Sequence, residues 1–290
     1  MKVETHRAYN PDKRIKINSQ EKIGRCFKWT DHMLKFLNDI KPDATSRYVL
    51  ALEGRLLDVV GGFRVAPPSF DAEEMLQDLS HLGNHPDLQD LMIRFICKHL
   101  DLPADHKPGP EEIEVLSLND SRVGRRLSYH RVKALVDLLG REEGIPLYKE
   151  IVSRILAAEG VERERIKKER LEKGEKEISS AENVERAVKA WTDYGLADFT
   201  VAVIDDHKVL YRFDSCLTHE ALKDFNDPDI AYLASCYVGD AEEFNTGRTR
   251  YLRRTQTLHH GDFCDELYWD VDFHMDPEQP SLEFTRMLGK

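Results

Sequence analysis

The sequence predicts an α+β fold, in which an N-terminal helical region precedes an antiparallel sheet packed with helices. Up to Gly195, apolar residues recur every three or four positions, the spacing of helices that bury one face. Beyond Gly195 they alternate with polar residues, as in strands that bury one face. The chain of 290 residues is long enough for one large domain or two ordinary ones.

The N-terminal region is expected to be helical after a short leader. Residues 1–18 are polar, and we expect a loose segment there. Helices are expected over residues 21–40 and 48–60, then from Asp71 onward and over 86–100. Residues 103–114 hold three prolines and several charges, which indicates a linker. We therefore expect an N-terminal helical domain over residues 1–110 and an α+β domain over residues 111–290.

The second domain is expected to begin with helices. One carries the apolar residues of 132–139 and ends near Gly140, and Pro146 is expected to open the next. Residues 161–178 are almost all charged, with both signs interleaved. This pattern favours a solvated helix supported by ion pairs one turn apart, and an interaction arm is the alternative. Helix is expected to continue over residues 187–194.

Strands and short helices are expected in the last third of the chain. Residues 199–203 and 209–213 alternate and flank a polar turn, which predicts a β-hairpin. Two short helices are expected over residues 218–225 and 229–237. Two further strands are expected over 251–258 and 266–273, and the turn between them is the densest group of reactive side chains in the chain.

Five residues of that turn are candidate catalytic groups: His259, His260, Asp262, Cys264 and Asp265. An imidazole can activate a neighbouring thiol as a nucleophile, and a carboxylate can orient the imidazole. Adjacent histidines at a strand end point in opposite directions, so we expect only one of them to face a shared site. The glycine between them and Asp262 is expected to allow a positive φ, and Asp262 to accept hydrogen bonds from backbone amides. Exposed turn residues are the alternative.

Four more residues are candidate substrate-binding groups: Arg254, Cys216, Cys236 and Tyr237. Arg254 can clamp a substrate carboxylate, although a surface ion pair is equally compatible with its position. The two cysteines lie at the edges of expected elements, so that with Cys264 they can meet in one pocket. The chain has no Cys-x-x-Cys pair, which excludes a zinc ribbon or thioredoxin motif. Zinc held by cysteine, histidine and carboxylate stays open, and so do inert buried thiols.

Composition restricts the classes of partner. The net charge of −11 gives no general attraction to nucleic acid or to anionic membranes. We expect a small-molecule substrate or ligand, no nucleic-acid or membrane partner, and a homo-oligomer as an option. The chain has no membrane-spanning apolar run, no signal-peptide core and an odd number of cysteines, which together favour a cytoplasmic protein. The motifs of phosphate-binding loops, dinucleotide folds and common hydrolases are missing from the sequence.

Residues 254–265 read Arg-Thr-Gln-Thr-Leu-His-His-Gly-Asp-Phe-Cys-Asp, and they follow one cysteine after a strand and another in a later helix. With the helix at 134–148, these features resemble the 2-amino-thiazoline-4-carboxylate hydrolase-like family over roughly residues 128–273. The resemblance implies a hydrolase that opens a C–N bond of a small cyclic substrate, using a thiol or a metal-activated water. A non-catalytic small-molecule binding or sensory protein is the main alternative, and a helical partner-binding protein is another.

Overall fold

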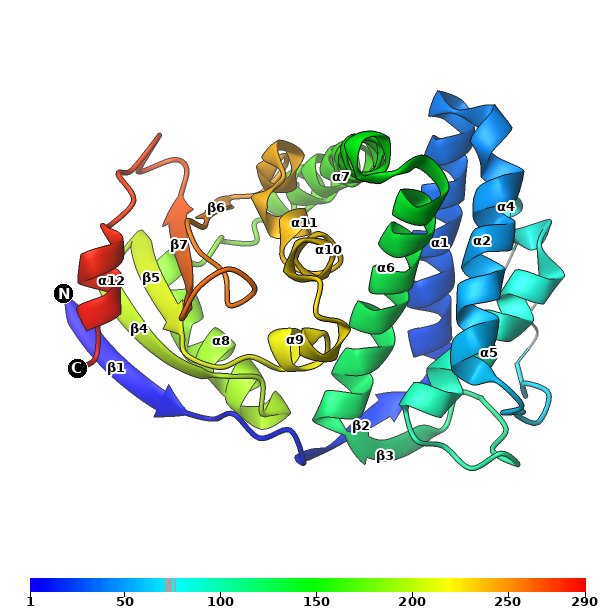
Figure 1. Ribbon diagram of the computed structural model, residues 1–290. Helices are drawn as coiled ribbons and strands as arrows, with labels where there is room; N and C mark the ends of the chain where they lie inside the picture. Colours follow the sequence, from blue (N-terminus) through cyan, green and yellow to red (C-terminus); the bar gives the residue numbers. More distant parts are fainter. Residues whose placement is uncertain (71–74, 76) are drawn as a thin grey trace. The chain divides into compact units, whose positions relative to one another are not determined.

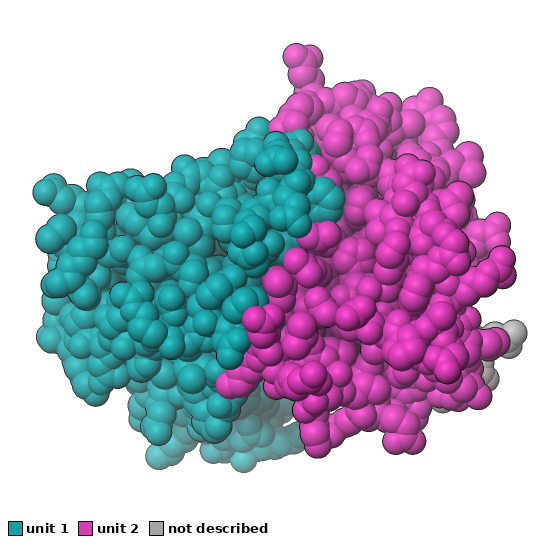
Figure 2. All heavy atoms as spheres, turned by 60° about the horizontal axis from the view of Figure 1, so that its bottom comes forward, with its two compact units in different colours: residues 1–11, 156–290 teal, residues 12–155 magenta. Residues whose placement is uncertain are grey.

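The computed structural model of the protein describes residues 1–70, 75 and 77–290 (Figure 1). The helix expected from Asp71 begins outside the described residues. The chain forms two compact units, which Figure 2 shows in different colours. Unit 1 contains residues 1–11 and 156–290, and unit 2 contains residues 12–155. The fold is α+β, as predicted, with an antiparallel sheet of five strands in unit 1.

Unit 2 is built from helices that bury apolar faces against one another. The helices of its described residues are α1 (Ser19–Ile40), α2 (Pro42–Val60), α4 (Ser80–Gly83), α5 (Pro86–His99) and α6 (Ser117–Leu139), followed by the start of α7 (Arg141–Glu172). The side chain of Asn18 caps α1 by accepting a hydrogen bond from the amide of Glu21. The helices expected at 21–40, 48–60 and 86–100 are confirmed, and α2 begins earlier, with Pro42 in its first turn.

The expectation of a loose N-terminal segment was wrong. Strand β1 (Lys2–Arg7) pairs with a strand of unit 1, and β2 (Arg14–Asn18) pairs with β3 (Glu112–Leu116) in unit 2. Most side chains of β1 are exposed, so no apolar alternation marked it. Strand β3 includes the last residues of the expected linker, and its pairing with β2 makes them part of unit 2. The two units divide after residues 11 and 155, and not at the predicted boundary after residue 110.

Helix α7 is longer than the sequence indicated. It starts at Arg141, and Pro146 lies inside it rather than at its first residue. A proline near a helix N-terminus removes a single backbone hydrogen bond, which the buried side chains Leu147 and Ile151 offset by packing. The charged segment is helical as far as Glu172, and Arg165 forms ion pairs with glutamates on either side of it.

The sheet of unit 1 has the strand order β1-β4-β5-β7-β6, and each neighbouring pair is antiparallel. Its remaining strands are β4 (Asp198–Asp205), β5 (Lys208–Phe213), β6 (Arg250–Arg253) and β7 (Cys264–Asp270). The predicted hairpin is therefore confirmed as β4–β5. Helix α8 (Ser180–Tyr194) packs Trp191 against one face, and Leu288, after α12 (Leu282–Met287), packs against the other.

Short helices connect β5 to β6. They are α9 (Leu217–Glu220), η1 (Lys223–Phe225), α10 (Pro228–Leu233), α11 (Tyr237–Asp240) and η2 (Glu242–Asn245). Strand β6 ends at Arg253 instead of residue 258, because the following residues leave the ladder and form the turn into β7. Among the helices of the described residues, none combines the length and the apolar character that crossing a bilayer requires.

Candidate active site around three thiols

A buried carboxylate holds the turn between β6 and β7. Asp265 is 0% exposed, and its carboxylate accepts hydrogen bonds from the amides of Thr255 and Gln256 at 2.9 and 2.7 Å. It also accepts from the Thr255 hydroxyl and from Nε2 of Gln279. Asp265 thus binds the turn's own backbone and not a histidine, so its expected part in orienting an imidazole finds no support in these contacts.

The glycine of the turn is needed for a close approach. A Cβ on Gly261 would lie 2.4 Å from Cδ of Gln256, whose amide donates to the Phe263 carbonyl at 3.1 Å. Gly261 is not among the described glycines with positive φ, so that expectation was wrong. Asp262 is exposed and forms no hydrogen bond with any described residue. The capping role expected of Asp262 therefore belongs to Asp265.

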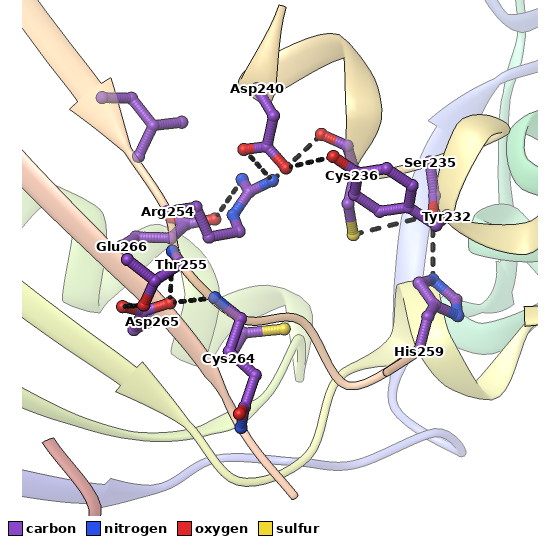
Figure 3. A network of polar contacts seen from close by, with 12 residues as sticks. Tyr232, Ser235, Cys236, Asp240, Arg254, Thr255, His259, Cys264, Asp265 and Glu266 are labelled. Atoms are coloured by element: carbon purple, nitrogen blue, oxygen red, sulfur yellow. Dashed lines mark hydrogen bonds and ion pairs between the residues drawn. The ribbon is translucent and has the colours of Figure 1, made fainter. Parts of the chain in front are cut away.

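Arg254 is the centre of a buried charge network (Figure 3). Its guanidinium pairs with Asp240 at 3.0 Å and with Glu266 at 2.7 Å, and only 8% of its side chain is exposed. It also donates to the backbone carbonyl of Cys236 at 2.9 Å. These partners come from α11, from the residue that precedes it and from β7, so Arg254 fixes the Cys236 segment to the sheet. A substrate clamp at Arg254 would compete with both carboxylates.

Two tyrosines complete this network from its ends. Tyr232 donates to Asp240 and Tyr268 donates to Glu266, both at 2.9 Å. Burial raises the pKa of Asp240, and the neighbouring Arg254 opposes that shift. Burial and the Glu266 carboxylate raise the pKa of Tyr268 well above its ordinary value, so its hydroxyl stays a donor. With one guanidinium between two carboxylates, the network carries one net negative charge when both are ionised.

The three cysteines expected to meet do lie close together. Cys264 begins β7, Cys216 precedes α9 and Cys236 precedes α11. Burial raises the pKa of the Cys264 thiol, and the nearby thiols of Cys236 and Cys216 add to the shift. Its Sγ accepts a hydrogen bond from the Leu258 amide at 3.0 Å. Figure 3 shows the sulfurs of Cys264 and Cys236 pointing into the space between Arg254 and His259. Cys264 is the more buried of the two, at 9% exposed.

The two adjacent histidines diverge, as expected. Nε2 of His259 lies 2.9 Å from the hydroxyl of Ser235, and its Nδ1 lies 3.4 Å from Nδ1 of His219. His260 points elsewhere, with its Nε2 3.3 Å from Asp229 and its ring against Tyr232. His259 is therefore the histidine on the side of the thiols. Burial lowers the pKa of His219, so that imidazole is neutral at pH 7.

Ser235 links His259 to Cys236 through a defined hydrogen-bond arrangement. Its hydroxyl lies 2.6 Å from the Ala231 carbonyl, which can only accept, so the single hydroxyl proton points there. His259 must then carry its proton on Nε2 and donate to Ser235. The Sγ of Cys236 lies 3.6 Å from the same oxygen, and the Ser235 hydroxyl can donate to it in place of the Ala231 carbonyl. Ser235 and His259 thereby orient the Cys236 thiol.

Hollows flank this centre on two sides. One of about 100 Å³ is lined by His219, His259 and residues of α10. Another of about 440 Å³ is lined by Asp240, Arg254 and residues of β6 and η2. Tyr237 starts α11 beside Tyr232, with ring centroids 6.1 Å apart, and burial raises the pKa of its hydroxyl. Among the described residues, no cysteine lines either hollow, and they are instead bordered by His259 on one side and by the Asp240–Arg254 pair on the other.

The part of the chain that the structure describes contains no cluster of side chains that could bind zinc. No group of three or more histidine, cysteine, aspartate or glutamate side chains there is arranged to hold a metal ion. Sequence reasoning missed three residues of the centre: Ser235, His219 and Glu266. Ser235 directly precedes Cys236, and His219 follows Cys216 by three residues, so proximity to the cysteines was the available signal.

No family model, curated protein or solved structure matches the chain. The family resemblance of residues 128–273 therefore stays a prediction that rests on the motif itself.

Proposed function

We propose that unit 1 is a thiol-dependent hydrolase that opens a C–N bond of a small cyclic amidine. The observation that carries this proposal is the setting of Cys236, whose thiol is oriented by Ser235 and His259 and whose carbonyl is held by Arg254. Positioning of a nucleophile against an electrophilic carbon is a large part of covalent catalysis. The sequence favoured Cys264 as the nucleophile, but Cys236 is the better candidate because it is less buried.

The charge of the centre supports an amidine substrate. With Asp240 and Glu266 both ionised, the Asp240–Arg254–Glu266 network has one net negative charge, so it favours a cationic group over a second carboxylate. A protonated cyclic amidine carries its positive charge on the group that contains the electrophilic carbon. The same network holds no free cation for a substrate carboxylate, which is why Arg254 is assigned here to positioning and not to substrate binding.

The reaction can be written with its atoms and protons balanced. The Cys236 thiol loses its proton to solvent, and the thiolate attacks the amidinium carbon, so that a C–S bond forms. The ring nitrogen takes up a proton from solvent, the ring C–N bond breaks, and the nitrogen leaves as an amine, which gives a thioimidate on Cys236. Water then attacks this carbon and expels the thiol, leaving an amide-type carbonyl on the opened product. The net reaction consumes one water.

The test is hydrolysis of 2-amino-thiazoline-4-carboxylate, followed as ring-opened product by mass spectrometry. Cys236→Ala is expected to reduce turnover to the uncatalysed background, because no other group supplies the C–S bond. Cys97→Ala, a thiol buried in unit 2, is the matched control and should retain turnover. If Cys264→Ala abolishes turnover and Cys236→Ala does not, the nucleophile is Cys264 and this assignment is wrong.

A non-catalytic binding protein is the second candidate, favoured by the raised pKa of the Cys264 thiol and by the full pairing of Arg254. In that case the same compound would raise the melting temperature without forming product. We also propose a reducing, cytoplasmic location, because all five cysteines are free thiols.

A further inference from the structure

We propose that a basic groove in unit 1, between the C-terminal part of α7 and the chain leading into β6, binds a small organic anion with an apolar body. The groove has a volume of about 300 Å³. Five cationic side chains and two carboxylates line it: Arg163, Lys167, Arg170, Arg248 and Arg250, with Glu175 and Glu177. This local excess of positive charge lies in a chain whose net charge is −11. The proposal does not depend on the hydrolase activity.

Arg248 is the cation that lacks a counter-ion. Its Nε donates to the Phe244 carbonyl at 2.8 Å, and its guanidinium lies 3.9 Å from the Phe244 ring centroid. These two contacts hold the guanidinium plane in place. Among the described residues, no carboxylate forms a hydrogen bond or ion pair with Arg248. Burial and the neighbouring Arg163 lower its pKa, and Tyr268 and Glu159 partly oppose that shift.

The other cations of the groove are compensated to different degrees. Arg163 donates to the Thr246 carbonyl and to Glu159, so it is already engaged. Arg170 pairs with Glu175 at 2.7 Å, whereas the distance from Lys167 to Glu177 is 4.0 Å, the limit of an ion pair. Arg248 and Lys167 are thus the two groups most able to bind a ligand anion. The anion would supply the carboxylate partner that Arg248 lacks and would replace the distant Glu177 beside Lys167.

Apolar side chains complete the binding surface. Ile166 and Leu171 line the groove and are 43% and 50% exposed. Both lie on α7 beside the cations, so a ligand with a charged head and a short apolar body can satisfy both surfaces. A carboxylate and a phosphate monoester share this chemistry, because a guanidinium binds either head through paired hydrogen bonds.

The test measures binding of hexanoate and of hexyl phosphate to the full chain by isothermal titration calorimetry at low salt. Arg248→Gln is expected to weaken binding about tenfold or more, since it removes a charge-assisted hydrogen bond. Arg165→Gln is the matched control, because Arg165 lies on the same helix outside the groove and pairs with Glu162 and Glu169. It should leave the affinity unchanged. The relative affinity of the two probes identifies the preferred head.

Lys167→Gln provides a second variant if Arg248→Gln does not fold, and it is expected to weaken binding severalfold. Equal affinities in the wild type and both groove variants would overturn the proposal, as would binding of neither probe by the wild type. Binding to vesicles of anionic lipid but to neither soluble probe would also overturn it, because the groove would then serve a membrane surface.

Discussion

Among single residues, Asp265 has the largest structural effect on the candidate site. Its buried carboxylate accepts hydrogen bonds from two backbone amides and a hydroxyl of the turn and from the side-chain amide of Gln279, which follows β7. A buried donor left without a partner costs about 1–3 kcal/mol. The position of Cys264, the preceding residue in the chain, and the path of the turn back to His259 both depend on this anchor.

Asp265→Ala is expected to lower the free energy of unfolding by about 2 kcal/mol, because two part-buried backbone amides lose their acceptor. Urea denaturation followed by tryptophan fluorescence measures the change. Asp262→Ala, three residues earlier and exposed, should change stability by less than about 0.5 kcal/mol. Equal effects of the two substitutions would show that Asp265 does not anchor the turn.

The residue types of the site could be predicted from the sequence, but the structural role of each residue could not. The convergence of Cys216, Cys236 and Cys264 and the divergence of His259 and His260 were both expected from their positions in the expected elements. The sequence placed the turn's anchor at Asp262 instead of Asp265, because nothing in a short turn says which carboxylate points inward. The pairing of Arg254 with Asp240 and Glu266 depends on the meeting of α11, β6 and β7, which are distant in the chain.

At the scale of elements, apolar periodicity predicted the helices and strands that bury one face. It missed a strand that is held in the sheet only by its backbone hydrogen bonds. The β4–β5 hairpin alternates because Phe199, Val201 and Tyr211 pack against α8. Strand β1 sits at the sheet edge with exposed side chains, so its pairing with β4 left no pattern to find. Helix α8 carries both signals, because it has an apolar stripe and an N-terminal capping box at Ser179 and Glu182.

Ser179→Ala is expected to destabilise unit 1 by about 1 kcal/mol, since the Glu182 amide loses its acceptor at the start of α8. Hydrogen exchange of the α8 backbone amides measures this loss of stability in the helix itself. Lys176→Ala is a nearby exposed control and should leave these rates unchanged. If the α8 amides are equally protected in both variants, the capping box contributes nothing to the helix.

For the molecule as a whole, buried histidines tie stability to pH. Burial lowers the pKa of His130 to about 3 and that of His99 to about 4, and nearby arginines oppose protonation of both. In the unfolded chain a histidine has a pKa of about 6.5. The unfolded state therefore binds more protons between these values, so the contribution of each histidine is complete above about pH 6.5 and is lost as the pH falls.

We expect the free energy of unfolding to fall by up to about 2 kcal/mol per buried histidine between pH 7 and pH 5. His130→Gln should show a shallower pH dependence over the same range, because it removes one of the two groups. Urea denaturation at a series of pH values tests this. A slope that is the same in the wild type and in His130→Gln would contradict the account.

The central claim, that Cys236 is the nucleophile of a thiol-dependent hydrolase, is tested most directly by trapping the thioimidate. The protein is mixed with 2-amino-thiazoline-4-carboxylate, quenched in acid, and analysed by intact mass and peptide mapping. We predict a substrate-derived mass on the peptide that contains Cys236, and its loss in Cys236→Ala but not in Cys97→Ala. Two results would contradict the claim. One is an adduct located only on Cys264, and the other is product formation by the Cys236→Ala variant.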